Sequence, residues 1–301
     1  MNEGHTLATP RRRRGRQRGT PCLLAILSVA IPTPAIPLAA QDYEISAIRY
    51  GEISGFPLKG LLPDAPEGEA IDIALVFWLL ENDERKVLFD TGFFRDAWLE
   101  RFDVSDFLRP DSALAQTGIT PDEVTDVVVS HAHWDHMGGI ELFPTATLWI
   151  QADEYAYYTG PAWQEGGRSG GIDPDDVLHL VRRNLLGEVR LIEGDGVEFL
   201  PGLVAHTGAR HTRSSQFLEV RGDPTWVLAS DNAYLYRGLR ERRASATFLP
   251  SDREGNLRAL DRMLALAGDT LRVVPGHDVL QFERFPASGP RVVRLTGGRE
   301  R

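Results

Sequence analysis

The residues best suited to chemistry lie in one hexapeptide, residues 131–136, which reads His-Ala-His-Trp-Asp-His. Imidazole nitrogens and carboxylate oxygens are ligands that Zn²⁺ and neighbouring transition metals accept. His131 and His133 are two positions apart, so in an extended segment they point to the same side and can bind one ion together. Asp135 and His136 follow where the chain is expected to turn into a helix, and there they can bind a second ion.

Three single residues further along the chain, His211, Asp231 and His277, complete the set of candidate ligands. Two ions held a few ångströms apart share a water molecule and lower its pKa, which makes a hydroxide nucleophile at neutral pH. The pattern therefore predicts a site with two divalent metal ions that catalyses hydrolysis. Zinc is the expected metal, and iron, manganese and cobalt are the alternatives.

The N-terminal segment, residues 1–40, is predicted to be a signal peptide rather than part of the globular domain. Six arginines between residues 11 and 18 precede an apolar stretch, residues 22–38, which ends just before Ala39-Ala40. A basic segment, an apolar segment and small residues at the end are typical of a secretory signal. Three prolines between residues 32 and 37 break the stretch before it reaches the ~20 residues of a membrane span. We expect cleavage near Ala40 and a secreted or periplasmic protein.

The remaining part, residues 41–301, is predicted to be one hydrolase domain with an acidic surface. The whole chain has 33 Lys+Arg and 43 Asp+Glu, and residues 1–40 contain six Arg and one Glu, so the remainder has 27 basic and 42 acidic residues and a net charge of −15. This charge repels nucleic acid, so a small-molecule substrate is expected. The single cysteine, Cys22, is lost with the signal, which excludes disulfides and thiol catalysis. No membrane contact is expected after cleavage, and a homodimer is left open.

The order of apolar and polar segments indicates an α/β fold. Alternating or apolar runs predict strands over residues 43–50, 71–80, 86–89, 124–130, 146–150, 202–205, 216–220, 226–229 and 272–274. Helical patterns cover residues 93–102, 121–124, 153–159, 175–186 and 252–267. Strands that interleave with helices in this way suit two sheets covered by helices, a single αββα domain.

Five short segments together resemble the metallo-β-lactamase superfamily, and within it they are most similar to the N-acyl-homoserine lactonases. The resemblance implies an αββα sandwich in which two mixed sheets are flanked by helices. The Tyr three positions after Asp231 is the feature that points to the lactonase branch. The segments are Asp90-Thr91-Gly92, the hexapeptide 131–136, Arg210-His211-Thr212, Asp231-Asn232-Ala233-Tyr234 and Pro275-Gly276-His277.

The resemblance also implies roles for individual residues. One metal would be bound by His131, His133 and His211. The other would be bound by Asp135, His136 and His277, with Asp231 bridging the two. Asp90 would accept a hydrogen bond from a ligand or its loop, Tyr234 would donate to the substrate carbonyl oxygen, and Asp135 or a water molecule would protonate the leaving alkoxide. One position departs from the family pattern, because Ser215 stands where a second His is usual.

The predicted function is the opening of a lactone ring by metal-bound hydroxide, with N-acyl-homoserine lactones (quorum quenching) as the expected substrates. β-Lactam hydrolysis, thioester hydrolysis of the glyoxalase II kind and a mononuclear iron persulfide dioxygenase are the alternatives. Two other histidines, His179 and His206, are expected to be structural. The aromatic residues of the central part either line an acyl-chain pocket or pack as a covering segment; they are Trp134, Tyr155, Tyr157, Tyr158 and Trp163.

Overall fold

The computed structural model describes residues 43–296. The chain divides into two units, Met1–Pro37 and Leu38–Arg301, and all described residues belong to the second. The predicted signal peptide therefore lies outside the described residues. Within residues 43–296, no helix is both long enough and apolar enough to cross a membrane.

The larger sheet contains eight strands and is mixed. Its first part is antiparallel, and the strands from β3 to β6 are parallel. In spatial order the strands are β12 (Ala287–Gly289), β13 (Val292–Arg294), β1 (Glu44–Pro57), β2 (Ala70–Glu81), β3 (Lys86–Phe89), β4 (Asp126–Val128), β5 (Thr147–Gln151) and β6 (Val189–Ile192).

The smaller sheet contains five strands and is also mixed. Strands β7 to β10 are antiparallel, and β11 is parallel to β10. In spatial order the strands are β11 (Val273–Pro275), β10 (Trp226–Ser230), β9 (Phe217–Val220), β8 (Leu203–His206) and β7 (Val197–Leu200).

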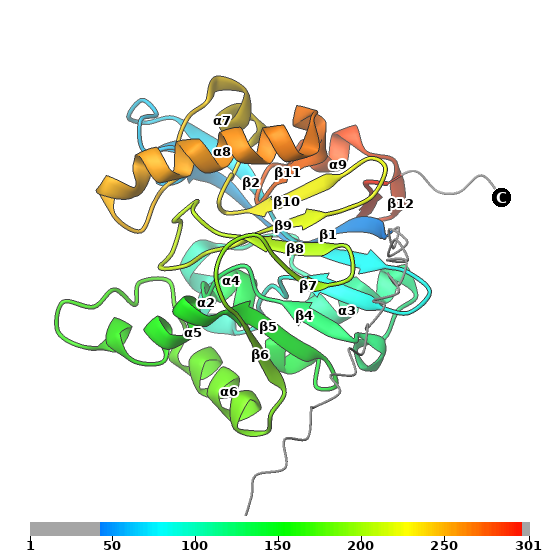
Figure 1. The fold of residues 1–301 in the computed structure, drawn as a ribbon. Helices are drawn as coiled ribbons and strands as arrows, with labels where there is room; N and C mark the ends of the chain where they lie inside the picture. The colour runs from blue at the N-terminus through cyan, green and yellow to red at the C-terminus, as the bar shows by residue number, and fades with distance from the viewer. Residues whose placement is uncertain (1–42, 297–301) are drawn as a thin grey trace, which may run out of the picture. The chain divides into compact units, whose positions relative to one another are not determined.

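The helices are segregated to the two outer faces (Figure 1). Six of them pack on the outer face of the larger sheet: α1 (Leu58–Leu61), α2 (Asp96–Phe102), α3 (Pro110–Leu114), α4 (Trp134–Met137), α5 (Ala152–Tyr158) and α6 (Pro174–Leu185). On the smaller sheet pack α7 (Tyr236–Glu241) and α8 (Arg253–Ala267), while α9 (Gln281–Arg284) precedes β12.

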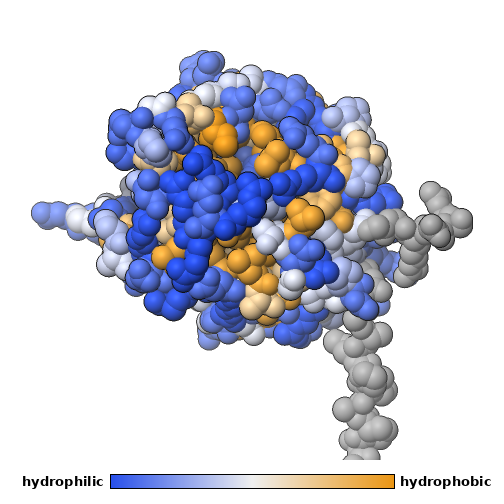
Figure 2. Space-filling model, turned by 90° about the horizontal axis from the view of Figure 1, so that it is seen from above, coloured by the Kyte–Doolittle hydropathy of each residue, from blue (hydrophilic) through white to orange (hydrophobic). Residues whose placement is uncertain are grey.

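Three layers of buried apolar side chains hold these elements together. Strand β2 contributes side chains to two of them. Its Leu75 and Phe77 belong to the layer under the helices, whereas the alternate residues Val76 and Trp78 belong to the layer between the sheets. Because neighbouring side chains of a strand point to opposite faces, a strand that is apolar throughout must be covered on both sides. A third layer joins the smaller sheet to α7 and α8. The face seen from above is mainly hydrophilic with scattered apolar patches (Figure 2).

This arrangement confirms the predicted αββα sandwich of two mixed sheets. The predicted helix 121–124 is a single 3-10 turn, Pro121–Glu123, whose capping box uses Thr120 and Glu123. It ends because Val124 is already extended, and β4 begins two residues later. The predicted strand 124–130 is correspondingly shorter, Asp126–Val128.

Candidate metal centre

Each candidate ligand lies in a loop or a short helix that follows a strand. His131 and His133 follow β4, and His133 is the N-cap of the short helix α4, whose first turn contains Asp135 and His136. The ligand loop can turn this sharply because Gly139 passes close to Thr91: a Cβ at Gly139 would lie 2.2 Å from the Thr91 carbonyl oxygen. The expected turn from an extended segment into a helix is therefore present.

The remaining three candidates come from the smaller sheet. His211 lies in the connection from β8 to β9, Asp231 follows the last residue of β10, and His277 follows β11 by one residue. Loops at the ends of packed strands are positioned by a rigid frame, which is why they often carry function. The larger sheet thus supplies four candidate ligands and the smaller sheet three.

Two of these ligands follow directly on a residue with a left-handed backbone. Arg210 has φ 59° and precedes His211, and Ser230 has φ 47° and precedes Asp231. Residues other than glycine rarely adopt this conformation, and it persists only when the surrounding structure imposes it. The backbone therefore carries strain at the points where it orients two candidate ligands.

The first group of candidate ligands consists of His131, His133, His211 and Asp231, whose ligand atoms all lie within 4.8 Å of one another. The Nδ1 atom of His133 lies 2.9 Å from His131 Nε2 and 3.0 Å from His211 Nε2. Three imidazole nitrogens therefore converge on one point, as three ligands of one ion would.

The second group consists of Asp135, His136 and His277, within the same 4.8 Å limit. Asp135 Oδ2 lies 3.5 Å from His136 Nε2 and 3.6 Å from His277 Nε2. All three side chains are nearly or fully buried. The structure thus brings together the three residues that the sequence assigns to a second ion.

Asp231 lies between the two groups and turns one oxygen to each. Its Oδ1 is 2.9 Å from His277 Nε2 and 3.2 Å from His136 Nε2. Its Oδ2 is 3.4 Å from His211 Nε2 and 3.8 Å from His131 Nε2. This is the geometry of a bridging carboxylate.

The donor atoms of this site fit a pair of metal ions. Although they are close together, the buried Oδ1 of Asp231 and Nε2 of His136 have no partner of hydrogen-bond geometry among residues 43–296. A buried polar atom is normally paired, so such atoms need an explanation. Five imidazoles and two carboxylates that aim their lone pairs inward are a donor set that divalent transition metals accept.

The outward nitrogens of the histidines are held by hydrogen bonds. His136 Nδ1 contacts Asp90 Oδ2 at 2.8 Å, and His131 Nδ1 contacts Ser130 Oγ at 2.8 Å. His277 Nδ1 lies 2.9 Å from the carbonyl oxygen of Ala74. Such partners fix the ring orientation and the tautomer, so that the inward nitrogen is free to bind a metal.

Asp90 performs the role expected of it and connects both groups. Its carboxylate accepts hydrogen bonds from the backbone N–H of Ser130 at 2.7 Å and from the hydroxyl of Ser230 at 3.0 Å, in addition to its contact with His136. The Ser130 hydroxyl also reaches this carboxylate, at 2.8 Å. One buried carboxylate therefore ties the hexapeptide to the end of β10.

The pKa values of the histidines are shifted in opposite directions in the two groups. Burial lowers the pKa of His131 well below its usual value and that of His133 to about 3, so both rings are neutral at pH 7 and able to bind a metal. Burial also acts to lower the pKa of His136 and His277, but the negative charge of Asp231 outweighs it and raises both. Because a proton on the ring competes with a metal ion for the same nitrogen, a raised pKa makes metal binding by these two rings more sensitive to acid.

Tyr234 lies beside the first group, as the sequence predicts. Its hydroxyl is 3.3 Å from His211 Nδ1, and its ring is stacked against that of His277 with centroids 5.7 Å apart. His211 Nδ1 also lies 3.1 Å from the carbonyl oxygen of Ala246, which can accept only the ring's proton. The Tyr234 hydroxyl therefore does not donate to His211, and its hydrogen-bond partner within the site is the carboxylate of Asp231.

Glu154 is a buried residue near the site that the sequence did not single out. It lies in the first turn of α5 and is completely buried. Burial raises the pKa of its carboxyl to about 7. A Glu in the first turn of a helix usually only caps that helix, so no signal in the sequence marks its contact with the ligand loops.

The remaining candidates lie outside the two ligand groups. Ser215, at the position where the family pattern has a second His, accepts a hydrogen bond from the backbone of His211 and donates one to Asn232. His206 is bound to Glu219 at 2.6 Å, and His179 lies 3.5 Å from a carboxylate oxygen of Glu141, so neither is a ligand.

The central aromatic residues are mainly packed. Trp134 is stacked against both Trp98 and Phe102, with ring centroids 4.9 and 4.7 Å away. Tyr158 is buried in the same apolar layer, while Trp163 is exposed. These contacts favour the packed segment over the acyl-chain pocket for Trp134 and Tyr158.

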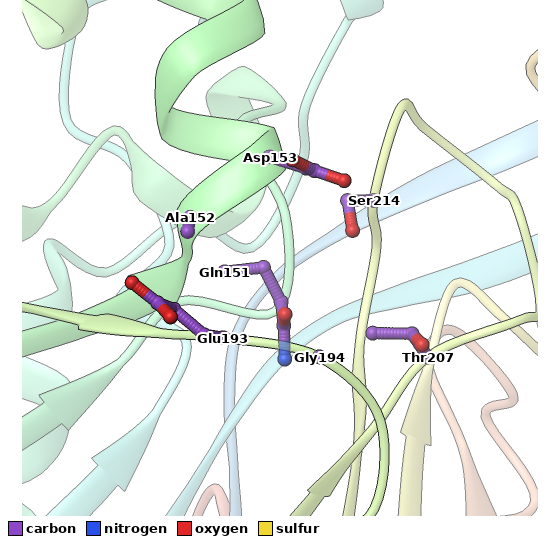
Figure 3. Close-up of a pocket in the computed structure, with 7 residues that line it drawn as sticks. All are labelled: Gln151, Ala152, Asp153, Glu193, Gly194, Thr207 and Ser214. Atoms are coloured by element: carbon purple, nitrogen blue, oxygen red, sulfur yellow. The ribbon is translucent and has the colours of Figure 1, made fainter.

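A polar pocket of about 400 Å³ is lined in part by the connection from β8 to β9, which also carries His211, but none of the candidate ligands lines it. In Figure 3 the side chain of Asp153 points toward Ser214. Its walls carry carboxylates, hydroxyls and an amide, without imidazole. The lining residues are Gln151, Ala152, Asp153, Glu193, Gly194, Thr207 and Ser214.

The model of one protein family, the metallo-beta-lactamase superfamily, matches residues 76–277. This range includes every candidate ligand, and the chain belongs to this superfamily. The resemblance noted in the sequence is thereby confirmed.

The relatives and the solved structures that are most similar include lactonases. The N-acyl homoserine lactonase AttM of Rhizobium johnstonii is 34% identical over 178 residues, which are 56% of this chain and 63% of AttM. The chain thus spans less than two thirds of the length of that relative. A Bacillus thuringiensis AiiA mutant with N-decanoyl-L-homoserine bound at its active site has a TM-score of 0.66 and 21% identity, over 81% of this chain and 97% of that chain.

A second solved structure with the same fold is AidC, a dizinc quorum-quenching lactonase in complex with a product. Its TM-score is 0.61 at 16% identity, over 86% of this chain and 96% of AidC. At these identities the two structures establish the fold, which agrees with the two sheets described above.

Proposed function

We propose that this chain is a metal-dependent hydrolase with two divalent ions that opens the lactone ring of N-acyl-homoserine lactones. The observation that carries the proposal is the position of Asp231, whose two oxygens face two separate groups of ligand atoms. Besides Asp231 itself, one group contains His131, His133 and His211, and the other contains Asp135, His136 and His277.

The similarity to AttM supports a lactone as the substrate, and the dizinc centre of AidC supports zinc as the metal. The acidic composition supports a small-molecule substrate rather than nucleic acid. A homodimer stays a prediction, since the described residues do not bear on it.

When bound, two divalent ions supply Lewis acidity: they polarise a carbonyl oxygen and lower the pKa of water. The other steps belong to side chains of this protein. The Tyr234 hydroxyl donates a hydrogen bond to the carbonyl oxygen of the ester as negative charge develops there. Burial raises its pKa well above the usual value, so it remains a donor at neutral pH. Burial acts to raise the pKa of Asp135, but His136 and His277 outweigh it and lower the pKa, so its carboxylate is ionised at neutral pH. In this proposal Asp135 accepts a proton from the attacking water and passes it to the alkoxide that leaves when the ring opens.

The second ligand group also distinguishes the alternatives. A mononuclear iron dioxygenase does not need His136 and His277 as ligands, yet both turn a nitrogen toward Asp231. β-Lactams and thioesters remain hydrolytic alternatives for the same centre, and they differ from lactones in the leaving group.

The proposal is tested by the metal content and the activity of one purified sample. We expect two equivalents of metal per chain and turnover of N-acyl-homoserine lactones that exceeds turnover of a β-lactam and of a thioester. His277→Ala should remove one equivalent, and Asp231→Ala should reduce both. One equivalent in the parent protein, unchanged by His277→Ala, would contradict the two-ion site. Faster turnover of the β-lactam or thioester would contradict the lactone.

A further inference from the structure

We infer that Glu154 is a positioning residue that serves one of the two ions, the ion of His131, His133 and His211. This inference rests on the two-ion site proposed above. Glu154 is not itself a ligand; its buried carboxylate fixes the separation of the two loops that carry these three histidines.

The hydrogen bonds of Glu154 reach both loops. Its Oε1 accepts the backbone N–H of Ala132 at 3.0 Å, and Ala132 stands between His131 and His133 in the sequence. The same oxygen accepts the hydroxyl of Thr212 at 2.6 Å, and Thr212 follows His211 directly.

The other oxygen strengthens the second of these connections. Glu154 Oε2 accepts the backbone N–H of Ser214 at 2.6 Å. Three donors from two loops thus converge on one completely buried carboxylate. Because a buried polar group without its partner is costly, each loop is held at the distance that this carboxylate sets.

The histidines of the second group are held by other residues. His136 is held by Asp90, and His277 by the carbonyl oxygen of Ala74. The hydrogen bonds described for Glu154 do not include Asp135, His136 or His277. Loss of its carboxylate should therefore affect the two ions unequally, which a general role in packing would not do.

The experiment is a titration of metal-free protein with Co²⁺, followed by visible absorption and by competition with a chromophoric chelator. His211→Gln and His277→Gln identify which absorption change belongs to which group. Glu154→Gln keeps the shape of the side chain but places an amide N–H₂ against an N–H donor. We expect it to weaken the step that His211→Gln abolishes by about 10–100-fold, and to leave the other step within about threefold.

Two further variants separate this role from a general effect on folding. Glu219→Gln is the matched control, because Glu219 is also buried and hydrogen-bonded, but to His206; parent-like binding of both ions is expected. Thr212→Val removes a single hydrogen bond to Glu154 and should weaken the same step more mildly, whereas Thr212→Ser should restore it. The Thr212 variants also decide the question if Glu154→Gln does not fold.

The inference is overturned if Glu154→Gln binds both ions as the parent does, or if both steps weaken equally. The proposed function is judged separately, on the parent protein. If the parent binds only one ion, the two-ion proposal is wrong. The inference about Glu154 is then supported if His211→Gln and Glu154→Gln both weaken binding of that ion, and it is overturned if Glu154→Gln does not.

Discussion

At the scale of single residues, Tyr234 shows how hydrogen bonds between protein groups determine which donor can interact with the substrate. The Nδ1–H of His211 donates a hydrogen bond to the carbonyl oxygen of Ala246. The hydroxyl of Tyr234, 3.3 Å from the same nitrogen, keeps its own proton, which it can donate to Asp231 or, in the proposed reaction, to the substrate. A donor that is buried and oriented before the substrate arrives costs little reorganisation during the reaction.

We therefore predict that Tyr234→Phe lowers kcat for an N-acyl-homoserine lactone about tenfold, with little change in KM and with both metals retained. One missing oxyanion donor typically costs ~10²–10³ in turnover, and a metal that shares the charge should reduce this loss. The measurement is steady-state kinetics at matched metal content. Tyr236→Phe is the control, because the buried Tyr236 hydroxyl has no hydrogen-bond partner among the described residues. An unchanged kcat would make Tyr234 a packing residue.

The sequence predicted the candidate ligands that the structure brings together, because their types and spacing are rare in a chain with eight histidines. It predicted Asp90 and Tyr234 through the family resemblance. Glu154 has no comparable local signal, since its hydrogen bond to Thr212 joins segments 58 residues apart. Such contacts exist only once the sheets have packed.

At the scale of elements, the close approach of β10 and β11 determines where the bridging carboxylate can lie. A Cβ at Gly276 would lie 2.7 Å from Asp231 Oδ1 and 2.8 Å from the backbone of Ser230. Neither neighbour is the flexible end of a long side chain. The glycine between β11 and His277 is thus required for space, whatever its backbone conformation.

Gly276→Ala is expected to displace Asp231, to lower metal content and to destabilise the protein by about 1–3 kcal/mol, the usual cost of overpacking. Urea denaturation with and without metal measures the stability, and elemental analysis measures the metal. Gly170→Ala provides the comparison, since a Cβ there meets nothing within 4 Å. If the two variants behave alike, the close approach has no consequence for the site.

Elements with strong patterns were predicted and short edge elements were not. The ranges 86–89 and 252–267 agree closely with β3 and α8. Strand β6 was missed because its two central residues, Arg190 and Leu191, are both exposed, which gives no alternation of apolar and polar residues. Four-residue helices such as α9 lack the length over which a helical period can be recognised.

At the scale of the whole molecule, stability should depend on pH through Asp176. This carboxyl is buried beside Arg95 at 2.7 Å, and burial raises its pKa to about 7. In the unfolded chain it ionises near pH 4. The folded state therefore holds a proton that the unfolded state has lost between these values, so this contribution to stability is present below pH 4 and disappears as the pH rises through 7.

We predict that, between pH 5 and pH 7.5, the free energy of unfolding of the parent falls by about 2 kcal/mol more than that of Asp176→Asn, which cannot ionise. Urea denaturation at both pH values provides the comparison. Asp175→Asn, at the exposed neighbouring position, should behave like the parent. Parallel curves for the parent and Asp176→Asn would show that Asp176 is ionised throughout.

The predicted export of the protein is tested on its N-terminus. Because residues 11–40 combine a basic run, an apolar run and small terminal residues, we expect the protein recovered from the periplasm or the medium to begin near Gln41. Intact mass spectrometry measures this directly, and cytoplasmic protein from the same cells is the control. Exported protein that retains residues 1–40 would contradict cleavage.

The division of the ligands between the two sheets has a mechanical consequence. Residues 43–296 contain no cysteine, so no disulfide can link these sheets. Ions bound by the hexapeptide on one side and by His211, Asp231 and His277 on the other would act as cross-links between them. A ligand that binds only the native state adds about 1.4 kcal/mol of stability for each tenfold rise in its free concentration above Kd. In surroundings poor in metal, the protein would lose its resistance to unfolding and proteolysis together with its activity.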